Sequence, residues 1–509
     1  MDFRQGIGLL GIVLAAIAAQ LNDQVLSIAL PDVAGGMGLS MDQASWLRTL
    51  FVTGQVVGMC MAPSLGIAFS FRRFALFAIL MNLVPTLLMA LGGGVAPVLI
   101  LRLIQGLASG FTIPLLMTVA LRVLGPEVRL YGLAVYAMTA TLTPNLATSF
   151  AALWVDGLRD YHWIFLQPLP FCTLAAACVW WGMEQEPPQY DRLRRFDWTG
   201  VALVAAGFGS LTIVLEQGDR FDWFNSPLIA ILALVSVVSL PLLVIVERYA
   251  PLPLMRFDLL ARRNFAYPVI VLIVFLIVSL SASQVPLTFL EQVRGLRPVQ
   301  IHQLSLGVAA SQIVLLPLTA VLLDHRHVDA RWVNAVGFAS ILFACYLDAH
   351  VTSAWGPQQF ILGEAFQALG FAFVVMPLLM IATNTIKPEE GPYGSALVNT
   401  PRAVAEAIGV WAIALIGRWR GELHRVRLTD LLGQNRLVLE QLGVLPRDTQ
   451  GPAARTVYAA LDRELERQVT TLTTIDTYAI MGLLAIALMI ALAVIPTRTY
   501  PPRIALAKQ

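Results

Sequence analysis

The sequence predicts an all-α polytopic membrane protein with about fourteen transmembrane helices. Of its 509 residues, 57% are hydrophobic and only 13% are charged, and the mean hydropathy is +0.72. A soluble chain would carry roughly 25% charged residues. Apolar runs of about 18 to 25 residues, each long enough to cross a bilayer as a helix, recur along the whole chain. These observations indicate a protein that is buried in lipid.

The predicted spans follow one another in order, most of them with short connections. They lie near residues 7–31, 46–68, 74–92, 97–120, 131–154, 163–183, 199–217, 227–247, 267–290, 303–323, 332–351, 358–381, 394–417 and 475–496. The first run, Gly6 to Leu30, is too long for a cleavable signal peptide and lacks a small-residue cleavage site, so we expect it to be the first spanning helix.

An even number of spans places both termini on one side of the membrane, and the basic residues indicate which side. Eighteen Lys and Arg residues fall on the side of the N-terminus, against four in the short loops opposite. Cytoplasmic loops carry the excess of positive charge, so both termini are predicted to be cytoplasmic. The long outer segment 418–474 is left out of this comparison, because long loops translocate regardless of their charge.

Two stretches rich in proline and charge, Met183–Asp197 and Glu247–Asn264, bracket the seventh and eighth spans. They predict a six-helix bundle over residues 1–185, a two-helix insert over 186–250, and a second six-helix bundle over 251–509 that carries the extracytoplasmic loop 418–474. A weak internal echo supports two related halves, as in transporters built from repeats. Arg102-x-x-Gln105 with Pro114 in the fourth span resembles Glu364-x-x-Gln367 with Pro377 in the twelfth.

The fourth span contains the most unusual residues of the chain. Arg102 near one end would cost at least about 2.5 kcal/mol in lipid, so it should face the protein interior or a water-filled cavity. Gly106, Gly110 and Pro114 follow at four-residue spacing and therefore share one helical face. Small residues on one face let a second helix approach closely. We expect this face to be a helix-packing motif.

Several classes of function are disfavoured by the residues that the chain lacks. Its two lysines, Lys387 and Lys508, do not lie in a phosphate-binding GxxxxGK[ST] motif, which argues against transport driven by ATP hydrolysis in this chain. The four cysteines have no CxxC spacing, and no HExxH or GxSxG motif occurs. We therefore expect no metal site, no cofactor and no membrane enzyme, and nothing indicates a nucleic-acid partner.

These features resemble the major facilitator superfamily, and within it the fourteen-helix drug:proton antiporters of the EmrB/QacA type. The first span reads LNDQVLSIALPDVAGGMGLS, similar to that family's LDxTIVNVALPxI. The fourth reads RLIQGLASGFTIPL, which resembles its RxxQGxxxGxxxPL signature, and the stretches DWTGVALVAAGFGSL and LEQGDRFDWFNS are similar as well. The resemblance covers nearly the whole chain. It implies the major facilitator fold and proton-coupled export of drugs or other amphipathic molecules across the bacterial inner membrane.

The chain departs from the family pattern at several charged or glycine-rich positions. The family's first-span aspartate aligns with Asn22, and the acid here is the next residue, Asp23. The loop after the second span, APSLGIAFSFRRF, has lost its acid, and the fifth-span glycine motif reads TPNLATSFAA. Glu406 stands where a glycine is common. These changes leave the fold assignment intact but weaken the inference of proton antiport.

A proton-coupled exporter needs a buried acid that loads and unloads protons, and a partner that sets its charge state. Asp23 and Arg102 are the leading candidates, although Asp23 could simply be solvated and Arg102 could bond backbone carbonyls. Arg402 and Glu406, four residues apart, are either a self-neutralised pair or a second proton site. Glu364 is a further candidate acid. Asn22, Gln105 and Gln367 are candidates to line the substrate cavity.

Other functions remain open from the sequence. The same fold could export one natural product or siderophore, or import a nutrient, and the degraded motifs also allow a sensor that no longer transports. The end of the outer segment, with Val457, Leu461, Leu465 and Val469 spaced by four, predicts an amphipathic helix. It could cap the outer face. In EmrB-type exporters a periplasmic adaptor protein works with an outer-membrane channel, so the resemblance also implies a docking role.

Overall fold

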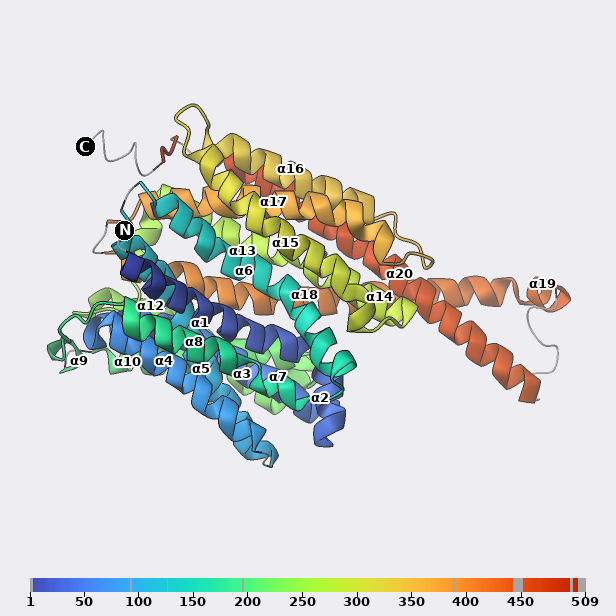
Figure 1. Cartoon of the computed structure of the whole chain (residues 1–509). Coiled ribbons are helices and arrows are strands. Elements are labelled where there is room, and N and C mark those ends of the chain that lie inside the picture. Colours follow the sequence, from blue (N-terminus) through green and yellow to red (C-terminus); the bar gives the residue numbers. More distant parts are fainter. Residues whose placement is uncertain are drawn as a thin grey trace.

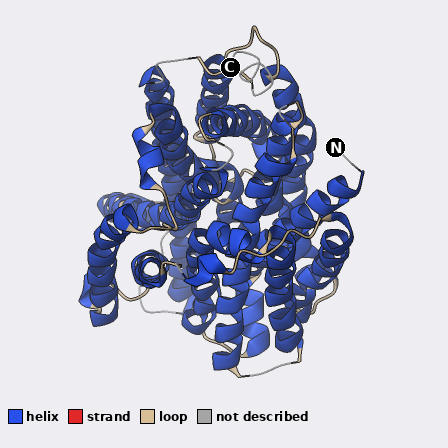
Figure 2. Ribbon diagram, turned by 90° about the vertical axis from the view of Figure 1, so that its left-hand side faces the viewer, coloured by secondary structure: helices blue, strands red, loops and turns tan. Residues whose placement is uncertain are grey.

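The structure is a computed structural model that describes residues 3–91, 94–125, 127–194, 196–387, 390–442, 452–494 and 498–501. Within these ranges the chain is built from helices and loops, without strands (Figures 1 and 2). Thirteen helical segments of the described chain are long and apolar enough to cross a membrane. The predicted fold class is therefore confirmed. Arg195, Arg503 and Lys508, which entered the charge comparison, lie outside the described residues.

The helices of the N-terminal half follow the predicted spans closely. They are α1 (Phe3–Ile28), α2 (Leu30–Met37), α3 (Met41–Phe69), α4 (Phe71–Ala90), α5 (Val95–Val123), α6 (Arg129–Ala151), α7 (His162–Leu166) and α8 (Pro168–Gly182). The pair α7 and α8 forms one span, broken near Pro168. The helix α6 completes fourteen crossings; it is less apolar than the others because it carries buried threonines and Asn145.

The two-helix insert follows a short helix, α9 (Asp191–Arg194). Its first span is α10 (Trp198–Val204), a π-helical turn (Ala205–Gly209) and α11 (Ser210–Gln217), and its second span is α12 (Pro227–Tyr249). The insert touches both halves. Gln217 Nε2 donates to Thr49 Oγ1 of α3 at 2.7 Å. On the other side, the ring of Trp223 lies 5.7 Å from that of Trp411 in the C-terminal half.

The C-terminal half repeats the arrangement of six spans. It comprises α13 (Arg263–Ser283), α14 (Val285–Arg294), α15 (Pro298–Leu323), α16 (Ala330–Asp348), α17 (Pro357–Asn384), α18 (Gly391–Gln434), α19 (Arg436–Gln441) and α20 (Pro452–Ala491). The start of α1 and the end of α20 lie at the same end of the bundle, as an even number of crossings requires (Figure 1). We call this the terminal end and the opposite one the far end.

The outer segment differs from its prediction. Separate spans over 394–417 and 475–496 were expected, but α18 runs for 44 residues and α20 for 40. The helices continue because no proline interrupts 418–434 or 453–491. Their extensions, with α19, project beyond the bundle as a hairpin (residues 418–442 and 452–474) and do not cap its far face (Figure 1). Residues 443–451 of this segment lie outside the described residues.

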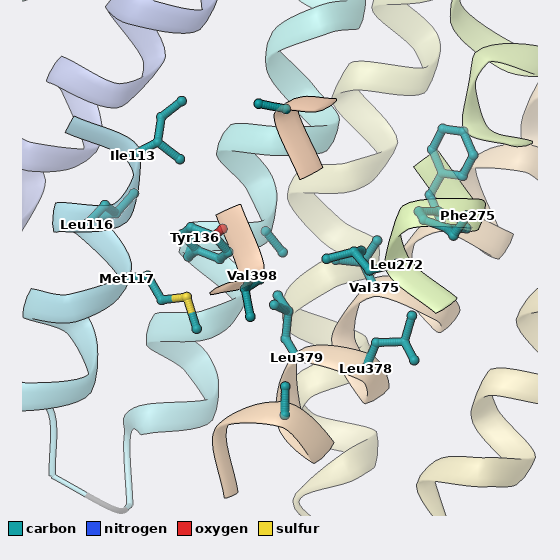
Figure 3. Close-up of a cluster of buried hydrophobic side chains, with 14 of the residues drawn as sticks. Ile113, Leu116, Met117, Tyr136, Leu272, Phe275, Val375, Leu378, Leu379 and Val398 are labelled. Carbon is teal, nitrogen blue, oxygen red and sulfur yellow. The ribbon is translucent and has the colours of Figure 1, made fainter. Parts of the chain in front are cut away.

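The two halves meet along α6 with α15 and along α3 and α5 with α18. Toward the terminal end the contact is apolar: Leu116 and Met117 of α5 face Leu379 of α17 and Val398 of α18 across the interface (Figure 3). These side chains are buried. At the far end the contact is ionic, and its centre is Arg297, the residue before α15.

Candidate functional site

The glycines of α5 bring this helix into backbone contact with α3. A Cβ on Gly106 would collide with the carbonyl oxygen of Phe51, and one on Gly110 would collide with that of Gln55. Gly54 and Gly58 of α3 face α5 in the same way. The carbonyl of Pro114 accepts a hydrogen bond from Ser395 Oγ of α18 at 2.8 Å. This face of α5 therefore packs on both halves of the molecule.

Arg102 lies fully buried inside the N-terminal half. Its Nη1 donates to Asn22 Oδ1 at 2.9 Å and to Gln105 Oε1 at 3.1 Å, and its Nε donates to the carbonyl of Leu47 at 3.1 Å. The guanidinium also lies 4.3 Å from the ring centre of Phe51. Within the described part of the chain, no carboxylate oxygen lies within 4.0 Å of it. Arg102 thus contacts Asn22 in place of the neighbouring acid, Asp23.

Gln105 extends this polar cluster to a fourth helix. Its Nε2 donates to Thr86 Oγ1 of α4 at 2.9 Å, and Asn82 of the same helix contacts Asn22 at 3.5 Å. The cluster joins α1, α3, α4 and α5 through groups that are all neutral except the guanidinium. Asn22 and Gln105 therefore hold Arg102 inside the half, and they do not line either of the two cavities between the halves that are described below.

Three of the predicted residues do meet at one cavity. Asp23 of α1 and Arg402 and Glu406 of α18 line a space of about 20 Å³ between the two halves. Arg402 Nε lies 3.4 Å from Glu406 Oε1, so these two residues form an ion pair within α18. Asp23 is 5% exposed, and its Oδ1 has no hydrogen-bond partner. The cavity is thus polar, and it is bordered by acids from both halves.

A second ion pair adjoins this cavity, and the sequence reasoning missed it. Arg48 Nη1 of α3 lies 3.3 Å from Glu216 Oε2 of α11. Arg48 also interacts electrostatically with Asp23 and Glu406. Glu216 lies near the end of the predicted span 199–217, where water could reach an acid, but its side chain is only 6% exposed because α11 packs against α3. A signal was present: Arg48 lies within the predicted span 46–68 without an acid one turn away.

The charges of this region balance when every acid is ionised. Asp23, Glu216 and Glu406 supply three negative charges, and Arg48, Arg402 and Arg102 supply three positive ones, with Arg102 acting on Asp23 from a greater distance. Charged groups within a membrane protein are stable when they are paired in this way. Binding of one further cation, either a proton or a cationic ligand, gives the region a net positive charge. A proton and a cationic ligand would therefore compete for binding to this region.

A second, mostly apolar cavity adjoins the first toward the terminal end. It measures about 60 Å³, and it shares Pro144 and Arg402 with the charged cavity. Its apolar walls include Leu272 and Phe275 of α13 and Val375 of α17 (Figure 3). A few polar groups also line it, from α6 (Tyr136, Thr141 and Asn145), α13 (Ser279 and Ser283) and α18 (Arg402). Such a pairing of apolar walls with a few charged groups suits an amphipathic ligand.

The two halves are in contact at both ends of the bundle, on either side of these cavities. The apolar contact described above closes the terminal end, where Tyr136 Oη also donates to Asn399 Oδ1 at 2.6 Å across the halves. The far end is closed by Arg297, whose Nη2 lies 3.0 Å from Asp32 Oδ1 and 2.9 Å from Asp156 Oδ1. Ligand pockets usually measure about 300–1,000 Å³. A small molecule could enter this conformation only after the halves separate at one end.

The remaining predicted residues lie apart from both cavities. Glu364 and Gln367 of α17 are buried within the C-terminal half, on the side that faces α13, α16 and α20. The structure therefore brings together Asp23, Arg402 and Glu406, places Arg102 behind them with Asn22 and Gln105, and separates Glu364 and Gln367 from this group.

Comparisons with known proteins agree with this architecture. The sequence model of the Major Facilitator Superfamily matches residues 12–410. The chain is 26% identical over 429 residues to the multidrug export protein EmrB of Escherichia coli K12, covering 82% of this chain and 81% of that one. It is 23% identical over 458 residues to the colistin resistance protein EmrB of Acinetobacter baumannii, covering 89% of each.

Solved structures show a similar fold at low sequence identity. The proton:xylose symporter XylE superposes with a TM-score of 0.58 at 11% identity, and the alignment covers 97% of this chain and 96% of that one. The human organic anion transporter MFSD10 gives a TM-score of 0.56 at 10% identity, with 95% and 100% coverage.

Proposed function

Because the chain belongs to the Major Facilitator Superfamily, as its family match over residues 12–410 shows, we propose that it is a proton-coupled exporter of drugs or other amphipathic small molecules. The observation that carries this proposal is the cavity bordered by Asp23, Arg402 and Glu406 at the junction of the two halves. Relatives that are named multidrug export and colistin resistance proteins support the substrate class. The protein is a transporter and not an enzyme.

The mechanism follows from the charge balance of the site. With its acids ionised, the cavity can accept one cation, and a proton on Asp23 or Glu406 would take the place of a cationic or amphipathic substrate. The halves rock about the cavity, so that it faces one side of the membrane and then the other. Protons moving inward would then drive the substrate outward. Arg102 would hold α1 through Asn22 and set the position of Asp23.

The orientation and the boundaries are part of the same proposal. The excess of basic residues at the terminal end supports cytoplasmic termini in the bacterial inner membrane. We place the boundaries of the two bundles and the insert at residues 185 and 250, where the charged, proline-rich joints lie. The far end then faces the periplasm.

The test uses everted membrane vesicles that contain the full-length protein. Vesicles are energised with an internal proton excess, and proton release is followed when ethidium or another candidate compound is added. Asp23→Asn and Glu406→Gln are expected to abolish release, whereas Asp462→Asn, an exposed acid on the hairpin, should leave it unchanged. Equal release from wild type and both cavity variants would refute the site. No release with any compound in wild type would refute antiport.

We also propose that the hairpin docks a periplasmic adaptor protein, which would connect the exporter to an outer-membrane channel. Its projection beyond the bundle and its exposed Leu431, Leu437 and Leu442 support this role. A photo-crosslinking residue at position 437 is expected to capture one adaptor-sized protein in cells, and the same residue at the exposed Trp332, near the terminal end, is expected to capture none. Identical products at both positions would contradict docking.

A further inference from the structure

Two carboxylic acids lie buried in the C-terminal half without any cation. Asp348 is the last residue of α16 and is 1% exposed, and Glu364 of α17 is 3% exposed. All four of their carboxyl oxygens are buried and lack a hydrogen-bond partner. In the described ranges, no Lys, Arg or His nitrogen lies within 4.0 Å of either group. The sequence singled out Glu364 but gave no sign of Asp348.

The two acids face one another across the contact between α16 and α17. Asp348 is the charged group that interacts electrostatically with Glu364. A Cβ on Gly363, the residue before Glu364, would collide with the carboxyl group of Asp348. The glycine therefore makes room for one acid directly beside the other.

The groups around the two acids are also incompletely bonded. Tyr478 of α20 is fully buried, its hydroxyl has no partner, and it interacts electrostatically with both acids. Gln367 Oε1 is likewise buried and unpartnered. Cys345 is the other titratable neighbour, and it is neutral as a thiol. Of the six unpartnered oxygens here, only that of Tyr478 carries a hydrogen when both acids are ionised.

Such a cluster is unstable unless a positively charged species joins it. Two carboxylates that share a low-dielectric site cannot both remain ionised, because each disfavours the charge on the other. Each buried polar atom without a partner also destabilises the folded state, because it has lost its hydrogen bonds to water. A proton on one carboxyl removes a charge and supplies a hydrogen-bond donor to the neighbouring oxygens. We propose that Asp348 and Glu364 form a proton-binding site in the C-terminal half, which holds a proton in this closed conformation.

The position of the site gives it a place in the transport cycle. Asp348 ends α16 at the far end, directly before the loop 349–356. On the other side, Gln367 Nε2 donates to Ser281 Oγ of α13 at 2.8 Å. Ser279 and Ser283 of the same helix line the apolar cavity. The site thus lies between the far end and the cavity. Its role in coupling rests on the proposed export by proton exchange, but its occupation by a proton does not.

Infrared difference spectroscopy on the purified full-length protein tests the occupation directly. Wild type is expected to show the carbonyl stretch of a protonated carboxyl that is lost in the double variant Asp348→Asn/Glu364→Gln and kept in Asp23→Asn and Asp462→Asn. Glu364→Gln, which resembles the protonated acid, should keep the melting temperature of wild type. A spectrum of the double variant that matches wild type would overturn the proposal.

A sodium ion is the other cation that these oxygens could bind, and thermal unfolding separates it from a proton. Replacing sodium chloride by choline chloride is expected to leave the melting temperature of wild type unchanged. Stabilisation by sodium that disappears in Glu364→Gln would overturn the assignment to a proton. For coupling, Glu364→Gln should lose ethidium transport driven by a proton gradient and keep ethidium exchange without a gradient. Full gradient-driven transport by this variant would refute the role in coupling and leave the infrared result as the separate test of occupation.

Discussion

Arg297 holds the far end closed, and its removal should open that end in a measurable fraction of molecules. In addition to the two ion pairs, its Nε donates to Asp156 Oδ1 at 3.0 Å. The Arg297 side chain is 50% exposed, and those of Asp32 and Asp156 are 28% and 14% exposed. Exposed ion pairs contribute about 0.2–1 kcal/mol each, so the two together stabilise the closed state by about 0.4–2 kcal/mol.

This free energy sets the expected size of the effect. Since about 1.4 kcal/mol corresponds to tenfold, Arg297→Ala should raise the ratio of far-end-open to closed molecules by about 2- to 30-fold. One contact survives the substitution, because the backbone N–H of Val299 donates to Asp156 Oδ2 at 3.1 Å. The ratio should therefore lie nearer the lower limit. The double variant Arg297→Ala/Asp156→Ala removes that contact as well and should open the far end further.

The ratio of far-end-open to closed molecules can be measured from the distances between two spin labels placed across the far end. Labels attached at Gly35→Cys in α2 and Gln303→Cys in α15 lie on opposite halves at exposed positions. Arg297→Ala should shift population from the short to the long distance. Arg294→Ala, which removes an exposed arginine at the end of α14 that forms no ion pair with the described residues, should behave as wild type. Identical distance distributions for Arg297→Ala and wild type would refute the argument that these ion pairs close the far end.

Three further predictions concern stability. Gly106→Ala should lower the melting temperature, because overpacking against the backbone of α3 costs about 1–3 kcal/mol. The control Gly307→Ala has open space at its Cβ position and should leave the melting temperature unchanged. Equal melting temperatures for the two variants would contradict the close contact of α5 with α3. Asn22→Asp places a carboxylate beside Arg102 Nη1 and should raise the melting temperature. The control Asn334→Asp buries a carboxylate without a cation and should lower it. A lower melting temperature in both variants would show that Arg102 needs no counter-charge. Two hydrogen bonds from Arg262, each 2.8 Å long, lower the pKa of Glu390 to about 2, so this contribution to stability is present above pH ~4.5 and is lost as the pH falls towards 2. Between pH ~4.5 and pH ~2 the melting temperature of Arg262→Ala should fall less than that of wild type. Parallel curves of melting temperature against pH for the two proteins would contradict the assignment.

Hydropathy predicted the membrane spans well because lipid imposes the same requirement on every crossing. The predicted run 199–217 differs from the observed Trp198–Gln217 by one residue. The prediction was less accurate outside the membrane, because α18 and α20 continue as helices into the hairpin, where the sequence is no longer apolar. A hydropathy pattern marks the membrane boundary and not the end of the helix.

Individual residues of the site could be predicted from the sequence, but their arrangement in space could not. Asp23 and Glu406 were recognised because acids in apolar runs are rare. Their meeting at one cavity depends on how the two halves place α1 and α18, which lie almost 400 residues apart in the chain, and the sequence carries no signal of that placement. The same reason explains Glu216, whose ion pair with Arg48 exists only because the insert packs on α3. Asp348 was missed because it lies at the end of a span, where an acid is ordinary.

The insert, which touches both halves, has a consequence for how the halves can move. Its link to α3 includes the buried pair Arg48–Glu216, whereas its ionic link to α18 is the pair Arg418–Asp219, at 2.8 Å with both side chains more than 40% exposed. Water can replace an exposed pair at little cost, but a buried pair cannot be broken so easily. When the halves rock, the insert should therefore travel with α3 and slide against α18. The N-terminal half and the insert then move together as a body of eight spans, and the C-terminal half moves as a body of six. The two moving bodies of this transporter therefore occupy unequal areas of the membrane.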